Sequence, residues 1–282
     1  IISKTDVLLL SEDGHYLLLT FLITVLMQLS FFTIAYIRQI DKLTDLAGSA
    51  NFVILATATL YLGESYTLER AVASLMVIVW GLRLGSYLFY RILVWGEDRR
   101  FDRIRQDFRK FLGFWALQIM WVWLLSLPVT YFNSISAQFS WSDLSTIAVS
   151  LFALGFAIES LADYQKFRHK RFSSDWCQTG LWSLSRHPNY FGEILLWSGI
   201  FTFCYGGGVP VWTGVGLVFL TILLLFVSGI PFLEASASQK YSGRPEYAIY
   251  RRNTSLFFPL PVSLYKKIPN WIKATLLLDF KR

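Results

Sequence analysis

The chain has 282 residues, of which 54% are hydrophobic and 17% aromatic but only 16% charged. A soluble domain typically has about a quarter of its residues charged, so this composition excludes an ordinary soluble protein and a disordered one and indicates a lipid environment. The net charge of +7 does not indicate nucleic-acid binding, because the basic residues stand in short loops between apolar runs.

Seven apolar runs are long enough to cross a membrane, which takes about 20 residues of helix. In chain order the expected transmembrane helices cover residues 16–37, 45–63, 71–94, 111–132, 144–163, 189–205 and 211–233. The second is weak, because its first half holds Asp45, Gly48, Ser49 and Asn51; the sixth is short and begins in polar sequence. The sequence predicts an all-α, polytopic integral membrane bundle of seven helices, with residues 1–282 as one membrane domain.

The basic residues are divided unequally among the loops. Of the 26 Lys and Arg residues, 22 follow the first, third and fifth segments or stand in the tail beyond Glu234. With seven spans, all of these lie on one side, and an excess of Lys and Arg marks cytoplasmic loops. We therefore expect the N-terminus outside, the C-terminus in the cytoplasm and an active site that opens to the cytoplasm. The host membrane would be a bacterial inner membrane or the endoplasmic reticulum.

Cysteine spacing argues against a disulfide or a metal site. Cys177 and Cys204 flank one apolar segment, so we expect them near opposite membrane faces and unpaired. Neither has the spacing of a zinc ligand, and no metal is expected. Residues 1–16 lack a basic region followed by a small-residue cleavage site, so no removable signal peptide is expected either.

Several charged residues fall within the apolar runs, where one at mid-helix costs about 2.5–3.5 kcal/mol. They are Asp45, Arg83, Arg91, Glu159, Asp163, Glu193 and Glu234. Arg91 and Glu234 stand near helix ends, from which their side chains could extend to the headgroups. Glu193 follows Asn189 by four residues, and Asp163 follows Glu159 by four, so each pair shares one helix face. These two polar faces predict the wall of a pocket open to the cytoplasm.

The strongest local motif is GLWSLSRHPNYFGE at residues 180–193, here called the signature motif. Pro188 suits the first turn of a helix, and Arg186 and His187 directly precede it. A helix N-terminus beside Arg and His suits a phosphate or another anion. The alternative is that Arg186 and His187 are only a basic flank of the membrane segment.

The signature motif resembles that of the membrane reductase superfamily containing the steroid 5-alpha-reductases, the sterol C14 reductases and their bacterial relatives. The isoprenylcysteine carboxyl methyltransferases share a shorter version of it. Four further stretches extend the resemblance over roughly residues 80–260: WGLRLGSYLFYR at 80–91, EDRRF at 97–101, DYQKFRHKR at 163–171 and EYAIYRRNTSLFFPLP at 246–261.

The resemblance implies that NADPH binds on the cytoplasmic side to residues 95–282, and that residues 1–94 form the substrate pocket. Asn189 and Glu193 match the residues at the nicotinamide, and Asp163 matches an acidic residue of the preceding helix. The other implied cofactor residues are Lys166, Arg168, Lys170 and Arg171 for the phosphates, and Trp182, Arg186, His187 and Tyr190 for the cofactor wall. No GxGxxG follows a strand, so the site is not a Rossmann site. A cationic pocket favours NADPH over NADH.

Reduction of a conjugated enone needs hydride delivery to the β carbon and an acid hydrogen-bonded to the carbonyl oxygen. The resemblance implies a tyrosine on the third helix, for which Tyr87 is the candidate and Tyr90 the alternative. It implies a carboxylic acid on the second helix, for which Asp45 is the candidate. The sequence DLAGSANF at 45–52 lacks the Trp-Gly pair that bacterial relatives have after this Asp. Tyr87 could instead be a packing or interfacial residue.

Three functions stay open. The first is an NADPH-dependent reductase of a sterol-like lipid, in particular a steroid 5-alpha-reductase (3-oxo-5-alpha-steroid 4-dehydrogenase). The second is a methyltransferase that uses S-adenosylmethionine on a lipid or an isoprenylcysteine carboxylate, and the third is a catalytically silent lipid-binding protein. The pair Asn189 and Glu193 and the basic run at 166–171 favour the dinucleotide. The expected partners are a lipophilic enone and the bilayer, without nucleic acid, and we expect a monomer.

Overall fold

The chain is built from helices. The computed structural model describes residues 15–40, 42–63, 66–96, 104–135 and 139–279. Within these ranges the elements are helices, and β structure is limited to one bridge between Ser185 and Ser255. The prediction of an all-α protein is therefore confirmed.

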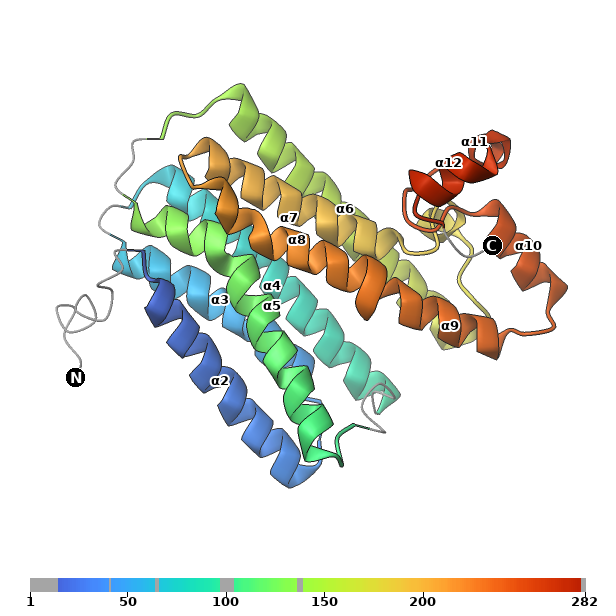
Figure 1. Ribbon diagram of the computed structural model, residues 1–282, viewed down its shortest axis with the longest axis horizontal. Coiled ribbons are helices and arrows are strands. Elements are labelled where there is room, and N and C mark those ends of the chain that lie inside the picture. The colour runs from blue at the N-terminus through green and yellow to red at the C-terminus, as the bar shows by residue number, and fades with distance from the viewer. Residues whose placement is uncertain (1–14, 41, 64–65, 97–103, 136–138, 280–282) are drawn as a thin grey trace. The chain divides into compact units, whose positions relative to one another are not determined.

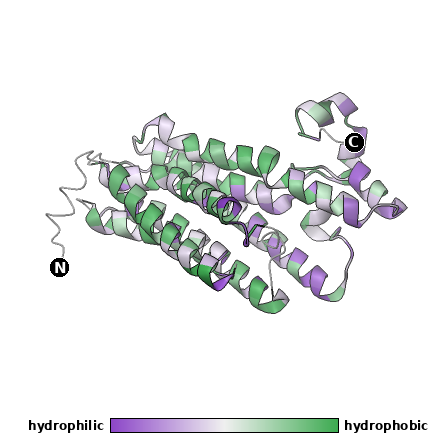
Figure 2. Cartoon of the chain, turned by 60° about the horizontal axis from the view of Figure 1, so that its bottom comes forward, coloured by the Kyte–Doolittle hydropathy of each residue, from purple (hydrophilic) through white to green (hydrophobic). Residues whose placement is uncertain are grey.

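Six helical segments of the described ranges are long and apolar enough to cross a membrane. They are α2 (Leu17–Arg38), α3 (Thr44–Leu62), α4 (Leu68–Trp95), α5 (Phe108–Ser134), α6 (Asp143–Phe172) and the stretch Val211–Lys240 (Figure 1). Hydrophobic residues dominate these helices in Figure 2. The length and composition of these helices confirm the prediction of a multi-pass protein suited to a lipid bilayer.

The predicted sixth segment forms helix α7 (Pro188–Gly206), which is not one of these six. Its first two turns hold Asn189, Tyr190 and Glu193, which lower its mean hydropathy. The helix begins at Pro188, one residue before the predicted segment 189–205. The count of seven spans and their orientation stay predictions.

The last apolar stretch is not one regular α-helix. It comprises the 3-10 helix η2 (Val211–Gly214), α8 (Val215–Ile222), the π-helical η3 (Leu223–Val227) and α9 (Ile230–Lys240). Single π-helical turns often occur at functional sites. A 3-10 helix, η1 (Gly180–Ser183), precedes α7, and the chain continues beyond α9 with α10 (Pro245–Asn253), α11 (Val262–Lys267) and α12 (Asn270–Thr275).

Contacts within the chain divide it into two compact units. The first comprises residues 1–149 and 200–219, and the second comprises residues 150–199 and 220–282. Helix α5 belongs to the first unit, so this division differs from the predicted grouping of helices before and after residue 94. The single membrane domain over 1–282 stays a prediction.

In the first unit, α2, α3, α4 and α5 pack as a bundle (Figure 1). The polar residues that weaken α3 as a membrane span are turned toward its neighbours. Gln28 Nε2 donates to Asn51 Oδ1 at 3.0 Å, and Gln118 Nε2 donates to the carbonyl oxygen of Thr44 at 2.9 Å. Polar groups in hydrocarbon need such internal partners. The second predicted segment is therefore a genuine helix whose polar face is buried in protein.

In the second unit, α6 and α7 approach closely at two glycines. A methyl group on Gly192 would lie 2.6 Å from the backbone nitrogen of Glu159, and one on Gly155 would lie 2.4 Å from that of Leu196. Small residues permit this close approach of helix backbones in membranes. The contact brings Glu159, which is buried, beside the turn of α7 that carries Glu193.

We expect Gly192→Ala to lower the thermal stability of the detergent-solubilised protein, because the added methyl group meets backbone atoms that cannot move aside. Overpacking of this kind typically costs about 1–3 kcal/mol. Gly113→Ala is the matched control, since nothing lies within 4 Å of a methyl group there, and it should leave the Tm unchanged or raise it. Equal Tm values for the two variants would contradict the close packing of α6 on α7.

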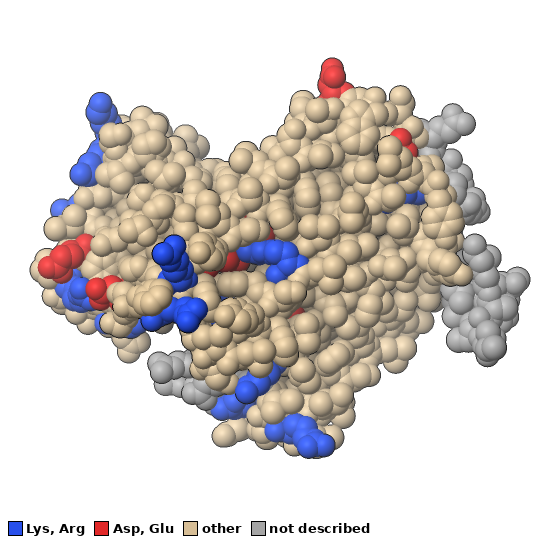
Figure 3. Space-filling model, turned by 180° about the vertical axis from the view of Figure 1, so that it is seen from behind, with Lys and Arg blue, Asp and Glu red and all other residues tan. Residues whose placement is uncertain are grey.

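Charged side chains are sparse on the face drawn in Figure 3, where wide areas hold neither acidic nor basic residues. Large apolar side chains such as Leu26, Ile37 and Val218 are exposed. Exposed apolar area of this kind fits contact with lipid and not with water.

Candidate functional site

The signature motif places Arg186 in a buried ionic network of the second unit. The side chain of Arg186 is 4% exposed, and its Nη2 lies 3.2 Å from Asp279 Oδ1 and 3.3 Å from Glu234 Oε2. Its Nη1 donates to the carbonyl oxygens of Arg251 and Thr254. A buried guanidinium requires partners of this kind, because they replace the water it has lost.

The loop that carries Arg186 is held by the segment after α10. The backbone nitrogen of Arg186 donates to the carbonyl oxygen of Ser255 at 2.8 Å, and Ser185 Oγ donates to that of Phe257 at 2.8 Å. The backbone nitrogen of His187 in turn donates to Ser185 Oγ at 3.1 Å. The conformation of the signature motif therefore depends on residues about 70 positions later in the chain.

His187 is the second buried member of the network. Its Nε2 lies 3.0 Å from Glu234 Oε1, and its ring stacks on Tyr190 with an interplanar angle of 11°. Burial lowers the pKa of His187 below its ordinary 6.5; the charges of Lys166 and Arg186 act in the same direction, and Glu234 opposes them. A neutral imidazole that donates from Nε2 to a carboxylate has its lone pair on Nδ1.

Two buried atoms of the signature motif have no hydrogen-bond partner among the described residues: Arg186 Nε, a donor, and His187 Nδ1, an acceptor. Buried polar atoms are almost always paired with protein, water or ligand. One donor and one acceptor on neighbouring residues of the chain therefore fit a polar molecule bound at this motif.

A cavity of about 310 Å³ adjoins the network. Arg186, Glu234 and Asp279 form part of its polar wall, together with Ser238 and Arg251. Its apolar wall consists of Leu225, Phe226, Ile230, Pro231, Ala235, Leu256 and Leu278. The π-helical η3 thus contributes directly to the cavity, through Leu225 and Phe226.

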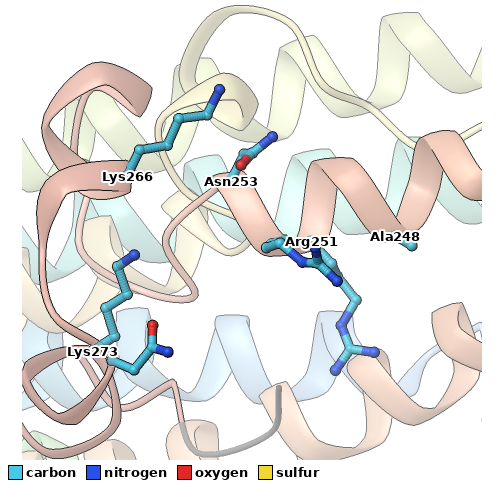
Figure 4. Close-up of a pocket in the computed structure, with 7 residues that line it drawn as sticks. Ala248, Arg251, Asn253, Lys266 and Lys273 are labelled. Carbon is cyan, nitrogen blue, oxygen red and sulfur yellow. The ribbon is translucent and has the colours of Figure 1, made fainter.

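A larger cavity of about 590 Å³ is formed by α10, α11 and α12 (Figure 4). We call it the cationic cavity, because the described residues that line it include basic side chains and amides and no carboxylate: Ala248, Arg251, Arg252, Asn253, Lys266, Asn270 and Lys273. Arg251 lines both cavities. Guanidinium, ammonium and amide donors without acidic neighbours suit phosphate oxygens.

The cationic cavity is connected to Arg186 through the end of the chain. Lys273, which is buried, has its Nζ 4.5 Å from the ring centroid of Tyr265. The Tyr265 hydroxyl donates to Asp279 Oδ2, and Asp279 pairs with Arg186. A change at either end of this series of contacts is therefore expected to affect the other.

The family model described as "Protein of unknown function (DUF1295)" matches residues 31–254. The chain belongs to the DUF1295 family. It is also similar to uncharacterized protein C594.04c of Schizosaccharomyces pombe (strain 972 / ATCC 24843), with 25% identity over an alignment of 256 residues covering 78% of this chain and 72% of the relative. No solved structure matches the chain.

The DUF1295 match includes the signature motif and α10 but ends before α11 and α12. Lys266 and Lys273 of the cationic cavity lie outside it, as does Asp279 of the ionic network. Part of the candidate site is therefore supplied by residues beyond the family match.

Among the predicted cofactor residues, the structure brings Lys166 and Trp182 together. Lys166 Nζ lies 4.5 Å from the centroid of the Trp182 ring, whose Nε1 donates to the carbonyl oxygen of Ala162 at 2.9 Å. The Tyr250 hydroxyl donates to the carbonyl oxygen of Trp182 at 2.7 Å. These contacts fix the Trp182 ring beside a basic side chain.

The other predicted cofactor residues differ in exposure. Asn189 and Glu193 are half-buried on the first turns of α7, and Asp163 is buried on α6. The side chains of Arg168, Lys170 and Arg171 are exposed on the last turns of α6. Their assignment to the phosphates stays a prediction, as do the cofactor roles of Asn189, Glu193 and Asp163.

The predicted substrate residues belong to the first unit. Tyr87 is half-buried with Arg83 Cζ 5.5 Å from its ring centroid, whereas Tyr90 is exposed. Asp45 Oδ2 lies 3.4 Å from Arg91 Nη2. Arg91 is therefore an ion-pair partner, although its position near a helix end also fitted extension to the headgroups. The catalytic roles of Tyr87 and Asp45 stay predictions.

The position of Glu234 near a helix end also fits extension to the headgroups, but its carboxylate contacts Arg186, His187 and Arg251 in the second unit. The sequence reasoning did not identify it as a site residue. It also missed Arg251, Arg252, Lys266, Lys273 and Asp279. The basic residues of the tail served as a topology signal, and Arg251 and Arg252 also as part of the resemblance at 246–261, but none of them was assigned to a site. The sequence around Asp279 gives no indication of a site, since its partner Arg186 lies 93 positions earlier.

Proposed function

We propose that the protein is an NADPH-dependent membrane reductase that reduces a conjugated C=C bond of a sterol-like lipid, in particular a 3-oxo-4-ene steroid. The observation that carries the proposal is the cationic cavity next to the ionic network of the signature motif. The DUF1295 family, itself of unknown function, includes steroid 5-alpha-reductase-like members.

The charge of the cavity supports a dinucleotide over S-adenosylmethionine. NADPH carries a pyrophosphate and a further phosphate, which match guanidinium and ammonium donors. S-adenosylmethionine carries a sulfonium, an ammonium and a single carboxylate but no phosphate, so its net charge is positive and a cavity lined by Arg251, Arg252, Lys266 and Lys273 suits it less well. A silent lipid-binding protein is the remaining alternative, and an assay of turnover separates it from the reductase.

In this proposal the second unit holds the cofactor. Asn189 and Glu193 bind the nicotinamide end, and Trp182 with Lys166 forms part of the wall. Arg186 Nε and His187 Nδ1 offer the donor and acceptor that are still unpaired within the described residues. Bound NADPH would supply the hydride. Tyr87 would hold a proton at the substrate oxygen, where negative charge develops.

We further propose that α7 is a seventh membrane span, with the N-terminus outside and the C-terminus in the cytoplasm. The polar first turns of α7 lie at the signature motif, where a binding site accounts for them better than lipid does. The cationic cavity would then open to the cytoplasm, where NADPH is available. The host membrane would be a bacterial inner membrane or the endoplasmic reticulum.

This topology predicts the labelling of single cysteines introduced at exposed positions in a background with Cys177→Ser and Cys204→Ser. Cysteines replacing Lys110 and Lys170 should react with a membrane-impermeant thiol reagent only from the cytoplasmic side. A cysteine replacing Ser142, between α5 and α6, should react only from the opposite side. Labelling of the first two positions from opposite faces would overturn the seven-span topology.

The cofactor assignment predicts that Asn189→Ala and Glu193→Gln each weaken NADPH binding while the protein still folds. Loss of a hydrogen bond to a buried group costs about 1–3 kcal/mol, or roughly 5- to 150-fold in Kd. Fluorescence titration of the solubilised variants measures this. The matched controls are Gln178→Ala and Glu246→Gln, which change exposed side chains of the same chemistry. Wild-type affinity in both site variants, or tight S-adenosylmethionine binding instead, would favour the methyltransferase.

A further inference from the structure

Glu234 is the residue at which the side chains of Arg186, His187 and Arg251 meet. Its Oε2 lies 3.3 Å from Arg186 Nη2 and 3.5 Å from Arg251 Nε, and its Oε1 lies 3.0 Å from His187 Nε2. The side chain is 14% exposed and stands on α9, 47 positions after His187. Glu234 therefore belongs in space to the signature motif, although it is far from it in the sequence.

The carboxylate of Glu234 determines which ring nitrogen of His187 carries hydrogen. Burial lowers the pKa of His187, so its ring is neutral at neutral pH and has hydrogen on one nitrogen only. A carboxylate accepts hydrogen bonds but does not donate them, so Nε2 donates to Glu234 and the lone pair is left on Nδ1. Stacking on Tyr190 and the bond from the His187 backbone nitrogen to Ser185 Oγ hold the ring in place. His187 Nδ1 is therefore a fixed acceptor, and it has no partner within the described residues.

Arg186 supplies the complementary donor. Its Nη2 pairs with Glu234 and Asp279, and its Nη1 donates to two backbone carbonyl oxygens. Its Nε is buried and has no partner within the described ranges. The motif thus offers a ligand one donor and one acceptor. A fully ionised phosphate only accepts hydrogen bonds and cannot pair with His187 Nδ1, whereas a primary carboxamide has both a carbonyl oxygen and an NH2 group.

The cavity of about 310 Å³ that Arg186 lines fits a neutral group better than an ion. The charged groups of its described lining are two guanidinium groups and two carboxylates, from Arg186, Arg251, Glu234 and Asp279. Apolar side chains of η3 and α9, such as Phe226, form much of the remaining wall. A flat, neutral ring with one hydrogen-bonding substituent suits such a lining.

We infer that Glu234 is a positioning residue for the carboxamide of the nicotinamide ring. It keeps the lone pair of His187 on Nδ1, which accepts a hydrogen bond from the carboxamide NH2 group, while Arg186 Nε donates to the carboxamide oxygen. Asn189 and Glu193, which the proposed function assigns to the nicotinamide end, follow on the first turns of α7. The inference rests on the proposed function and adds the residue that fixes the acceptor.

The test compares NADPH with its reduced 3-acetylpyridine analogue, in which a methyl group replaces the carboxamide NH2 group. In titrations followed by tryptophan fluorescence, the solubilised wild type should bind the analogue about tenfold more weakly, because one hydrogen bond is lost. Glu234→Ala should raise the Kd for NADPH about tenfold. It should leave the Kd for the analogue within about twofold, since Asp279 still holds Arg186.

Two further variants show whether the hydrogen-bond acceptor of Glu234 is what matters. Glu234→Gln should keep the Kd for NADPH within about twofold, because its amide oxygen still accepts from His187 Nε2. Glu246→Ala is the matched control, since it removes an exposed carboxylate of α10, and it should change neither Kd. A Glu234→Gln variant as weak as Glu234→Ala would contradict the role of the acceptor.

The position of the hydrogen on His187 gives a readout that does not depend on the cofactor. The chain has three histidines, so ¹⁵N labelling of histidine gives few ring signals, and His187→Gln identifies those of His187. We expect hydrogen on Nε2 in the wild type and in Glu234→Gln, and a shift toward Nδ1 in Glu234→Ala. Loss of packing alone would lower the Tm without moving the hydrogen from one nitrogen to the other.

The outcomes separate this inference from the proposed function. Equal loss of affinity for NADPH and for the analogue in Glu234→Ala would overturn the inference and leave the function. A wild type that discriminates against an analogue with hypoxanthine in place of adenine, but not against the acetylpyridine analogue, would assign the donor and acceptor to adenine and also overturn it. A wild type that binds no NADPH would overturn both.

The inference can be decided even if Glu234→Ala does not fold. In that case the wild type alone is sufficient. Equal affinities for NADPH and the acetylpyridine analogue, or hydrogen on His187 Nδ1, would overturn the role of Glu234. A tenfold preference for NADPH together with hydrogen on Nε2 is the expected result.

Discussion

Arg186→Met is expected to destabilise the second unit more than any other single substitution of a basic residue. The change removes the ion-pair partner of Asp279, which keeps a hydrogen bond from Tyr265, and one of the partners of Glu234, which keeps His187 and Arg251. Removal of one partner of a buried ion pair costs about 3–5 kcal/mol, because the remaining charge is uncompensated. For a chain of this size, that corresponds to a decrease of roughly 10 °C in Tm. Thermal unfolding in detergent measures the effect.

The double variant Arg186→Met with Asp279→Asn provides the internal check. Asp279→Asn removes the carboxylate that loses its ion pair with Arg186, so the double variant should be less destabilised than the sum of the single variants. Arg171→Met is the matched control, since Arg171 is exposed, and it should change the Tm little. If Arg186→Met unfolded at the same temperature as Arg171→Met, the ionic network would contribute nothing to the stability of the fold.

Tyr87→Phe is expected to slow turnover by about 10²–10³ while NADPH binding and most substrate binding are kept. The hydroxyl group matters chiefly when the substrate oxygen becomes enolate-like, so its loss affects the transition state more than the ground state. A single lost oxyanion donor has an effect of this size in well-studied enzymes. The assay follows NADPH oxidation by absorbance with testosterone or progesterone as substrate.

Tyr90→Phe is the matched comparison, because Tyr90 is exposed three positions after Tyr87 on the same helix. Asp45→Asn should also slow turnover, and the double variant with Tyr87→Phe should lose less than the product of the two single effects. Full activity in Tyr87→Phe would remove Tyr87 from the mechanism and favour Tyr90. No NADPH oxidation with any such enone would overturn the steroid assignment.

The helices were predictable because most of them are long, continuous runs of apolar residues. The predicted segments at 16–37 and 111–132 lie within or nearly within α2 and α5, because a lipid-exposed helix must be apolar over most of its surface. Segment 45–63 was doubtful from its polar residues alone. The structure shows why it forms α3: the amides of Gln28 and Asn51 pair with each other, and such pairing is invisible in a linear pattern.

The candidate site was likewise predictable from the sequence only in part. The signature motif was recognisable because Arg186, His187, Pro188 and Glu193 are close in sequence. The residues that complete it were not, because Asp279 and Lys273 come from short helices whose composition resembles any basic tail. Their contribution depends on how α10, α11 and α12 pack, which places the buried Lys273 at a cavity and Asp279 against Arg186.

The sequence alone determined that this protein is a helical, multi-pass membrane protein with a polar signature at residues 180–193. Apolar composition and local spacing are properties of contiguous residues, and the bilayer imposes helix length directly. Only the tertiary structure decided which charges neutralise one another and which remain to face a ligand. Glu234 and Asp279 pair with Arg186, while Arg252 and Lys266 line the cationic cavity. That distinction depends on contacts between residues 47 and 93 positions apart in the chain, which local sequence patterns do not encode.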